Sequence, residues 1–306
     1  FNIRDLKWDE EILKALNIPK TILPEVKESS GYFGFAKVFG QEIPILSMVG
    51  DQQGALFGQG CIDPGSCKIT YGTGAFLLLN TGKKIVLSSD SLLSTIGISI
   101  GGEVSYAIEG SVFIAGALMK WLKEELGLFS DYEEIEVLAN EVEDSLGVVI
   151  VPAFSGLGAP YWHSETRGSI FGLTRGVNKR HIIRAGLEAV ALQVNALIES
   201  IGRDCDLELK DIKVDGGMAG STLFLELQSA LLKKRIIRTE SCELTAYGAY
   251  LLAGLAAGFW SDRAGLFTNR SSHQVIETES NEFWRNDLIR AWDKAVKATI
   301  SYSKSN

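Results

Sequence analysis

The sequence IPILSMVGDQQ, residues 43–53, joins an apolar strand to a single carboxylate, Asp51, and YGTG, residues 71–74, follows from a second apolar strand. A carboxylate at the end of a strand can accept the proton of a hydroxyl group. The glycine-rich turn offers backbone N–H groups and the Thr73 hydroxyl to phosphate oxygens. A carboxylate base that faces a phosphate-binding turn suits the transfer of a phosphoryl group to an alcohol.

A third stretch, VDGGMAGS at residues 214–221, runs from an apolar strand through glycines into the predicted start of a helix. The N-terminus of a helix carries free N–H groups and partial positive charge, which suit a nucleotide phosphate. The stretch lacks the GxxxxGK[ST] spacing of a P-loop, and the GxGxxG pattern of dinucleotide-binding proteins fails at Gly217. It therefore predicts a nucleotide site of another kind.

Each of these motifs also has a purely structural interpretation. Asp51 could cap the helix that follows it, YGTG could be an ordinary hairpin turn, and Ser221 could cap the next helix. The acidic segment Glu133–Glu143 reads as the solvated face of a helix. Singly the motifs are weak, and the functional interpretation depends on their occurring together.

The order of predicted elements indicates an α/β fold with a mixed sheet. Hairpin strands come first, at 67–71, 75–80, 93–99 and 104–109, and strands and helices alternate after them. The expected helices are 52–60, 112–126, 131–144, 179–201, 221–232, 244–258 and 281–303, and the later strands are 147–152, 168–173, 211–215 and 235–238. Pro64-Gly65 marks the expected boundary between residues 1–60, the C-terminal remnant of a first domain, and a second domain at 61–306, which ends in a helical tail.

Composition narrows the class of protein. The chain has 306 residues, a net charge of -8 and 46% hydrophobic residues, which excludes a mostly disordered chain and argues against a general nucleic-acid binder. Its cysteines are scattered, without the spacing of metal ligands or of a disulfide scaffold, which suits a reducing compartment, so we expect a cytoplasmic protein. The uncharged run 244–260 would reach roughly 25 Å as a helix, short of a ~30 Å hydrocarbon core, so we expect no integral membrane segment.

Longer segments of the chain resemble the FGGY family of carbohydrate kinases, and most closely its members that phosphorylate glycerol. The resemblance rests on segments spread over nearly the whole sequence, namely ILSMVGDQQGALFGQ (45–59), ITYGTGAFLLLNTG (69–82), VPAFSGLGAPYW (151–162), GSIFGLTRGVN (168–178) and residues 244–260. It implies the actin/hexokinase/Hsp70-like fold, in which two RNase H-like domains hold ATP in the cleft between them. The implied reaction is ATP-dependent phosphorylation of glycerol to sn-glycerol 3-phosphate.

The resemblance also implies roles for individual residues. Asp51 would be the catalytic base and would hold Mg²⁺ through water, with Gln52 and Phe76 beside the substrate. The residues expected at the nucleotide are Gly72, Thr73, Gly116, Met119, Lys120, Gly217, Met218 and Ser221. Met218 and Ser221 differ from the alanine and asparagine that the family often carries there, and Lys120 replaces a common glutamine or arginine.

Most of the residues with which this family grips glycerol, and its first phosphate loop, have no counterpart in these 306 residues. We therefore expect a partner domain of the same enzyme and an inactive chain when this part is alone, and we also expect a homo-oligomer. The alternatives are another FGGY kinase acting on a sugar or polyol such as xylulose, and a non-catalytic ATP-binding module of the actin/Hsp70 type.

Overall fold

The computed structural model describes residues 1–239, 243–261, 263–267 and 273–304. Within them the strands are β1 (Ser30–Val38), β2 (Gln41–Ser47), β3 (Cys67–Tyr71), β4 (Ala75–Gly82), β5 (Leu93–Ile100), β6 (Glu103–Val112), β7 (Val149–Val151), β8 (Ser169–Phe171), β9 (Ile212–Asp215), β10 (Ile236–Thr239) and β11 (His273–Ile276). The α-helices are α1 (Glu10–Ala15), α2 (Asp51–Gly58), α3 (Gly116–Glu124), α4 (Glu133–Asn140), α5 (Lys179–Asp204), α6 (Thr222–Leu232), α7 (Leu244–Ala256) and α8 (Glu282–Lys304). The 3₁₀ helices are η1 (Lys20–Ile22), η2 (Gly217–Gly220) and η3 (Ala264–Phe267).

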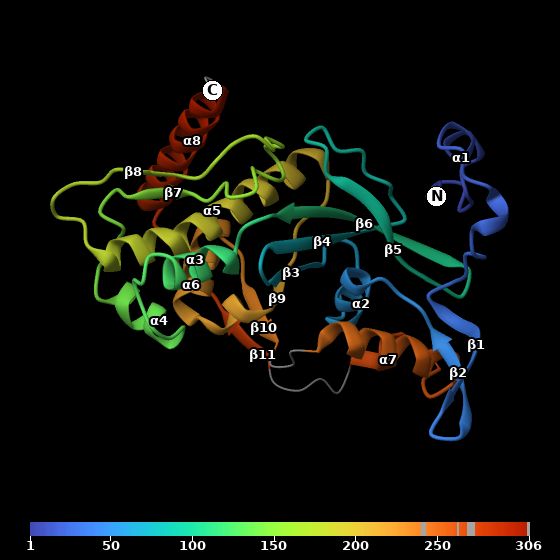
Figure 1. Cartoon of the computed structure of the whole chain (residues 1–306). Helices are drawn as coiled ribbons and strands as arrows, with labels where there is room; N and C mark the ends of the chain where they lie inside the picture. Colours follow the sequence, from blue (N-terminus) through green and yellow to red (C-terminus); the bar gives the residue numbers. More distant parts are fainter. Residues whose placement is uncertain (240–242, 262, 268–272, 305–306) are drawn as a thin grey trace.

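A seven-stranded mixed sheet lies at the centre, in the order β11-β10-β9-β3-β4-β6-β5 (Figure 1). β3, β9 and β10 run parallel to one another, and the remaining neighbours pair antiparallel. β3 therefore stands where the parallel half of the sheet meets the antiparallel half. Ligands of α/β sheets bind at the carboxyl ends of parallel strands. In this sheet β3 ends at Tyr71 and β9 ends at Asp215, so we expect a ligand site near these two residues.

One face of the sheet carries the main core. Ile69, Leu77 and Ile108 project from it and are almost fully buried against α3, α5 and α6. α5 is the longest helix, and it passes through this core with buried residues along most of its length. By length and composition α5 could cross a membrane, but 78% of its most apolar stretch is buried inside the fold.

The opposite face is covered by α2, and α7 crosses α2 at very close range. A Cβ atom added to Gly248 would lie 1.9 Å from the Gly54 carbonyl oxygen, and one added to Gly58 would lie 2.1 Å from the Leu244 carbonyl oxygen. Glycine is required here because the two backbones touch without intervening side chains. The Thr245 hydroxyl also donates to the Asp51 carbonyl oxygen at 3.2 Å, so α7 holds the start of α2.

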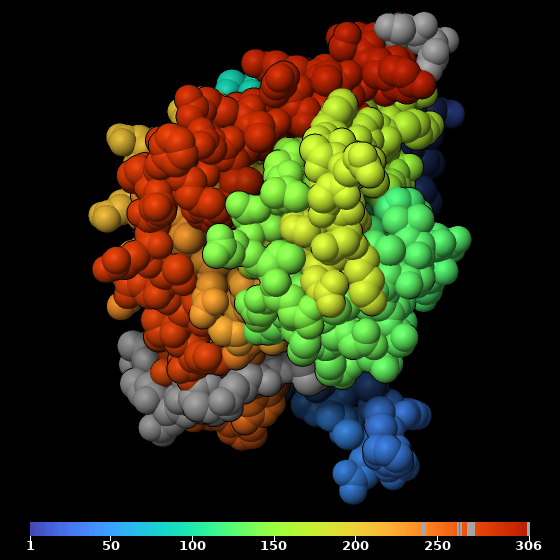
Figure 2. All heavy atoms as spheres, turned by 90° about the vertical axis from the view of Figure 1, so that its left-hand side faces the viewer, coloured from blue at the N-terminus to red at the C-terminus, as the bar shows by residue number. Residues whose placement is uncertain are grey.

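The hairpin of β1 and β2 lies outside the central sheet and projects below the body of the molecule, where it is blue in Figure 2. It is joined to α7 by hydrogen bonds from the Ser30 hydroxyl to the Leu252 carbonyl oxygen (2.8 Å) and from the Ser47 hydroxyl to the Ala249 carbonyl oxygen (2.9 Å). Several large apolar side chains of the hairpin are exposed, Phe39 almost entirely.

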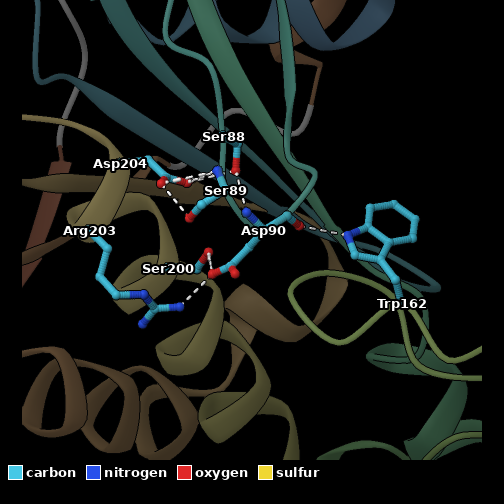
Figure 3. Close-up of polar contacts among 7 residues, drawn as sticks. All are labelled: Ser88, Ser89, Asp90, Trp162, Ser200, Arg203 and Asp204. Carbon is cyan, nitrogen blue, oxygen red and sulfur yellow. Dashed lines mark hydrogen bonds and ion pairs between the residues drawn. The ribbon is translucent and has the colours of Figure 1, made fainter.

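A polar clasp joins the loop before β5 to the end of α5 (Figure 3). The Asp204 carboxylate accepts hydrogen bonds from the Ser88 and Ser89 hydroxyls, both at 2.7 Å, and from the Ser89 N–H at 3.1 Å. The Asp90 carboxylate accepts from Ser200 (2.6 Å) and from Arg203. We call these residues, with Trp162 donating to the Asp90 carbonyl oxygen at 2.9 Å, the α5 clasp.

The predicted α/β fold with a mixed sheet is confirmed, and the predicted strands and helices from residue 67 onward all occur with modest changes at their ends. Two strands were not expected, β1 and β11. The strand before Asp51 is β2, which pairs with β1 in a separate hairpin and lies outside the central sheet. Of the cysteines, Cys242 lies outside the described residues.

Candidate active site

A cavity of about 950 Å³ opens at the carboxyl ends of β3 and β9. All eight residues predicted from the sequence to meet a nucleotide line it, namely Gly72, Thr73, Gly116, Met119, Lys120, Gly217, Met218 and Ser221. A further wall comes from α4, which contributes Ile135 and Val137, from Tyr132 just before it and from Leu187 of α5. Apolar walls with a few polar groups are typical of small-molecule sites.

Glycines allow three backbone segments to converge at the floor of this cavity. A Cβ atom on Gly116 would lie 2.6 Å from the Gly72 carbonyl oxygen, and one on Gly216 would lie 2.4 Å from the Tyr71 carbonyl oxygen. Gly216 also has φ of +92°, a conformation that disfavours other residues. The turn is fixed to the start of α3 by hydrogen bonds from the Gly116 N–H to the Gly72 carbonyl oxygen (2.9 Å) and from the Ala115 N–H to the Thr73 carbonyl oxygen (2.8 Å).

The start of α6 matches the structural interpretation of its sequence, a serine cap. The Ser221 hydroxyl accepts a hydrogen bond from the Phe224 N–H at 3.2 Å, so Ser221 is the helix cap. The Glu136 carboxylate of α4 accepts from the N–H groups of Thr222 and Leu223, each at 3.2 Å. These N–H groups are occupied by protein oxygens and are not free for a phosphate. Glu136 was expected on a solvated helix face. It caps α6 as well because α4 packs against α6, a contact between distant segments that the spacing of residues along the sequence does not predict.

Asp51 is the first residue of α2, and Gly50 occupies the cap position. The capping interpretation of Asp51 is therefore wrong in detail, although its carboxylate oxygen accepts the Gln52 N–H at 2.7 Å. A carboxylate in the first turn is favoured by the helix dipole. The side chain is exposed to solvent, as a base that meets an incoming alcohol must be.

Gln52 follows Asp51 in α2, Phe76 stands in β4, and neither lines the 950 Å³ cavity. Gln52 is joined to β3 through a contact between its side-chain oxygen and the Lys68 ammonium. Phe76 stands directly across from Thr70 in the ladder between β3 and β4, and Thr70 is two residues before Gly72. The predicted substrate residues and the phosphate turn thus flank the same end of β3.

Lys68 is the polar residue that the sequence analysis did not single out. Its side chain is fully buried, and burial lowers its pKa while the Asp215 carboxylate raises it. Burial raises the pKa of Glu109, the Lys68 ammonium lowers it, and the Asp51 carboxylate raises it. The charges of Lys68 and Asp51 therefore both act on Glu109. The sequence alone did not indicate this, because a single lysine in a strand is usually exposed, and only the register of the sheet shows that Lys68 is buried.

The described residues contain no group of three or more His, Cys, Asp or Glu side chains that could hold a metal ion. The exposed Asp51 carboxylate nevertheless suits Mg²⁺, which enzymes commonly bind through one or two carboxylates together with substrate phosphates and waters. The structure thus has an exposed carboxylate at the start of α2 and a glycine-rich turn that lines a cavity of about 950 Å³ at the end of β3.

The chain matches two family profiles. Residues 67–257 match the C-terminal domain of the FGGY family of carbohydrate kinases, and residues 1–58 match the N-terminal domain of the same family. Glycerol kinase of Fusobacterium nucleatum is 48% identical over 99% of this chain, and glycerol kinase of Clostridium botulinum is 49% identical over 99%. The aligned part is 62% and 61% of those relatives' own lengths, so the chain spans about three-fifths of the curated relatives it matches.

Solved structures give the same grouping. The crystal structure of Plasmodium falciparum glycerol kinase with ADP superposes with a TM-score of 0.90 at 36% identity, over 98% of this chain and 61% of that one. Ligand-bound xylulose kinase from Lactobacillus acidophilus has a TM-score of 0.82 at 20% identity, over 97% of this chain and 61% of that one, and this likeness concerns the fold alone.

Proposed function

Because the chain belongs to the FGGY family of carbohydrate kinases, we propose that it supplies the catalytic base and the nucleotide-binding half of an ATP-dependent glycerol kinase. The product would be sn-glycerol 3-phosphate. The 48% and 49% identity to named glycerol kinases favours glycerol over the other polyols of the family. The proposal concerns the whole enzyme, of which this chain corresponds to about three-fifths.

The proposed chemistry assigns one step to Asp51. Its carboxylate accepts the proton of a terminal glycerol hydroxyl while that oxygen forms a bond to the γ-phosphorus of ATP. The bond between the γ-phosphorus and the bridging oxygen breaks, and ADP leaves with the electron pair. Phosphoryl transfer of this kind depends mainly on positioning and charge stabilisation.

The nucleotide would occupy the 950 Å³ cavity. Its phosphates would meet the Gly72-Thr73 turn, and its base and ribose would lie between α3, α4 and η2, against Met119 and Met218. Mg²⁺ would travel with the nucleotide and contact Asp51 through water, where it would offset the charge that develops on the phosphate oxygens. A cytoplasmic location and a homo-oligomeric state are further parts of the proposal.

One observation carries the proposal above the others. The eight nucleotide residues expected from sequence resemblance come from three separate segments of the chain, yet all of them line a single cavity at the end of β3. A non-catalytic nucleotide module could share that cavity. It would have no use for an exposed carboxylate at the start of α2, next to the residue that contacts Lys68 of β3, which favours a kinase.

Replacement of Asp51 tests the proposal. In the full-length enzyme that contains this chain, Asp51→Asn should lower kcat for glycerol by about 10²–10⁴-fold, because the base is lost. Binding of Mg-ADP, measured by calorimetry, should stay within about twofold. Asp63→Asn is the matched control, since Asp63 is exposed and its carboxylate pairs with Lys210 at 3.4 Å. Normal turnover in the Asp51 variant would refute the base, and a wild-type enzyme that prefers xylulose or gluconate would refute the substrate.

A further inference from the structure

Lys68 projects from β3 towards α2 and has no exposed surface. Its ammonium donates to the Gln52 side-chain oxygen and, at 3.0 Å, to the Thr70 hydroxyl. Burial of a lysine is rare because it removes a charge from water, and it requires specific partners. These partners belong to the strand that leads to the phosphate turn and to the helix that begins at Asp51.

The contact fixes which end of the Gln52 amide faces the substrate side. An ammonium group has donors only, so it accepts no hydrogen bond and selects the amide oxygen of Gln52. The amide nitrogen must then point away from Lys68. Within the described part of the chain this nitrogen has no protein partner, so both of its N–H groups remain for a ligand.

We propose that Lys68 is a positioning residue, which holds the Gln52 amide with its N–H groups directed at a substrate hydroxyl oxygen beside Asp51. The inference rests on the proposed phosphorylation of an alcohol at this site. A hydroxyl that donates its proton to the Asp51 carboxylate keeps a lone pair that can accept from the Gln52 amide. Asp51 and Gln52 are consecutive residues of α2, so the buried Lys68 ammonium orients the side of the site that they form.

The surroundings explain why a cation occupies this position. The Asp215 carboxylate accepts from the Gln59 side-chain amide at 3.0 Å through one oxygen, and its other oxygen, buried, has no hydrogen-bond partner among the described residues. Glu109 lies on the same face, since it pairs with Leu78, which in turn pairs with Lys68. A neutral residue in place of Lys68 would remove the positive charge that acts on Asp215 and Glu109.

A neighbouring lysine provides a matched control. Lys213 stands directly beside Lys68 in the ladder between β3 and β9, and its ammonium donates to the carbonyl oxygens of Gln59 (2.7 Å) and Gly60 (3.1 Å). Lys213→Met removes a similar charge from the same sheet face without touching Gln52. It should lower stability and leave the kinetics for glycerol unchanged.

The test is a double-mutant cycle in the full-length enzyme, with glycerol kinetics, Mg-ADP affinity and urea unfolding measured for each variant. Lys68→Met should lower kcat/KM for glycerol by about 10–100-fold, because misplacement of a substrate-positioning group costs this much. Gln52→Ala should lower it comparably, and Lys68→Met should add little in the Gln52→Ala background. Mg-ADP affinity should remain within about twofold throughout.

A second variant does not depend on the folding of Lys68→Met. Gln52→Glu keeps an acceptor for the Lys68 ammonium and removes the N–H donors, so it should fold normally and lose kcat/KM as Gln52→Ala does. Wild-type kinetics in Gln52→Glu, or additive losses in the cycle, would overturn the proposal. A wild-type enzyme inactive on glycerol would refute the proposed substrate instead, and the same cycle would then be measured on the polyol that it does phosphorylate.

Discussion

Gly116 and Gly220 both line the nucleotide cavity, but a side chain would meet different surroundings at each. At Gly116 a Cβ atom would lie 2.6 Å from a backbone oxygen of the phosphate turn, and that oxygen cannot move without the turn. At Gly220 nothing lies within 4 Å of the added atom. Cavity residues of the same type therefore differ in how strictly the backbone requires them.

We expect Gly116→Ala to weaken Mg-ADP binding by at least about tenfold, because displacing the turn misplaces its phosphate donors. Gly220→Ala should bind within about twofold of wild type. Calorimetric titration with Mg-ADP measures both variants. Equal affinities would mean that the turn does not contact the nucleotide phosphates.

At the same scale, residues with a distinctive local pattern were predictable and residues defined by distant contacts were not. Gly72, Thr73 and Gly217 stand in glycine turns next to apolar strands and line one cavity, and the roles that resemblance gave them stay predictions. Lys68 and Glu136 have no local signature. Their positions follow from strand register and from the packing of α4 on α6, which a single sequence does not specify.

At the scale of elements, the α5 clasp holds the C-terminal end of the longest helix against the loop before β5 (Figure 3). Burial raises the pKa of Asp204, but the hydrogen bonds from Ser88 and Ser89 outweigh this and hold it below its usual value. The hydrogen bonds from Ser200 and Arg203 likewise lower the pKa of Asp90. Both carboxylates are therefore easier to ionise in the folded chain than in the unfolded one.

The sign of the pH effect follows from these directions. Stability rises with pH wherever the unfolded chain binds more protons than the folded chain. The clasp therefore contributes its full stabilisation above the aspartate pKa of the unfolded chain, about 3.9, and loses it as pH falls through the lower pKa values of the folded chain. Asp204→Ala should lower the free energy of unfolding by about 2 kcal/mol at pH 7, and the difference should shrink below about pH 4. Urea unfolding at several pH values measures this. Asp206→Ala, at an exposed position two residues further, is the control, and an equal loss there would contradict the assignment.

Elements from residue 67 onward were predictable because period, length and turn residues agree along that part of the chain. β1 was missed because SGYFGFAKV contains glycines and follows a mixed segment, and its pairing with β2 is set by a partner strand. β11 has only four residues, and it exists because it pairs antiparallel with β10. Short strands depend on the neighbour that completes them.

At the scale of the whole molecule, the nucleotide cavity is built entirely from residues 71–221 of this chain, whereas the chain covers only 61–62% of its relatives. We expect the 306-residue chain alone to bind Mg-ADP measurably. Its turnover of glycerol should be lower by at least about 10³-fold than that of a full-length relative, because orientation of the substrate depends on groups from both walls of the cleft. Calorimetry and a coupled ADP-release assay measure the two quantities, and full activity of the chain alone would contradict the expectation.

The position of β3 has a consequence for how the chain folds. On one side β3 pairs with β4, its sequence neighbour, and on the other with β9, which lies far along the chain. Contacts between distant segments close large loops and tend to form late. The Gly72-Thr73 turn can therefore arise early within a local hairpin, while Gly216 and Gly217 reach it only after the intervening helices have folded. During synthesis on the ribosome, nucleotide binding would accordingly mark the completion of this domain and could not guide its first steps.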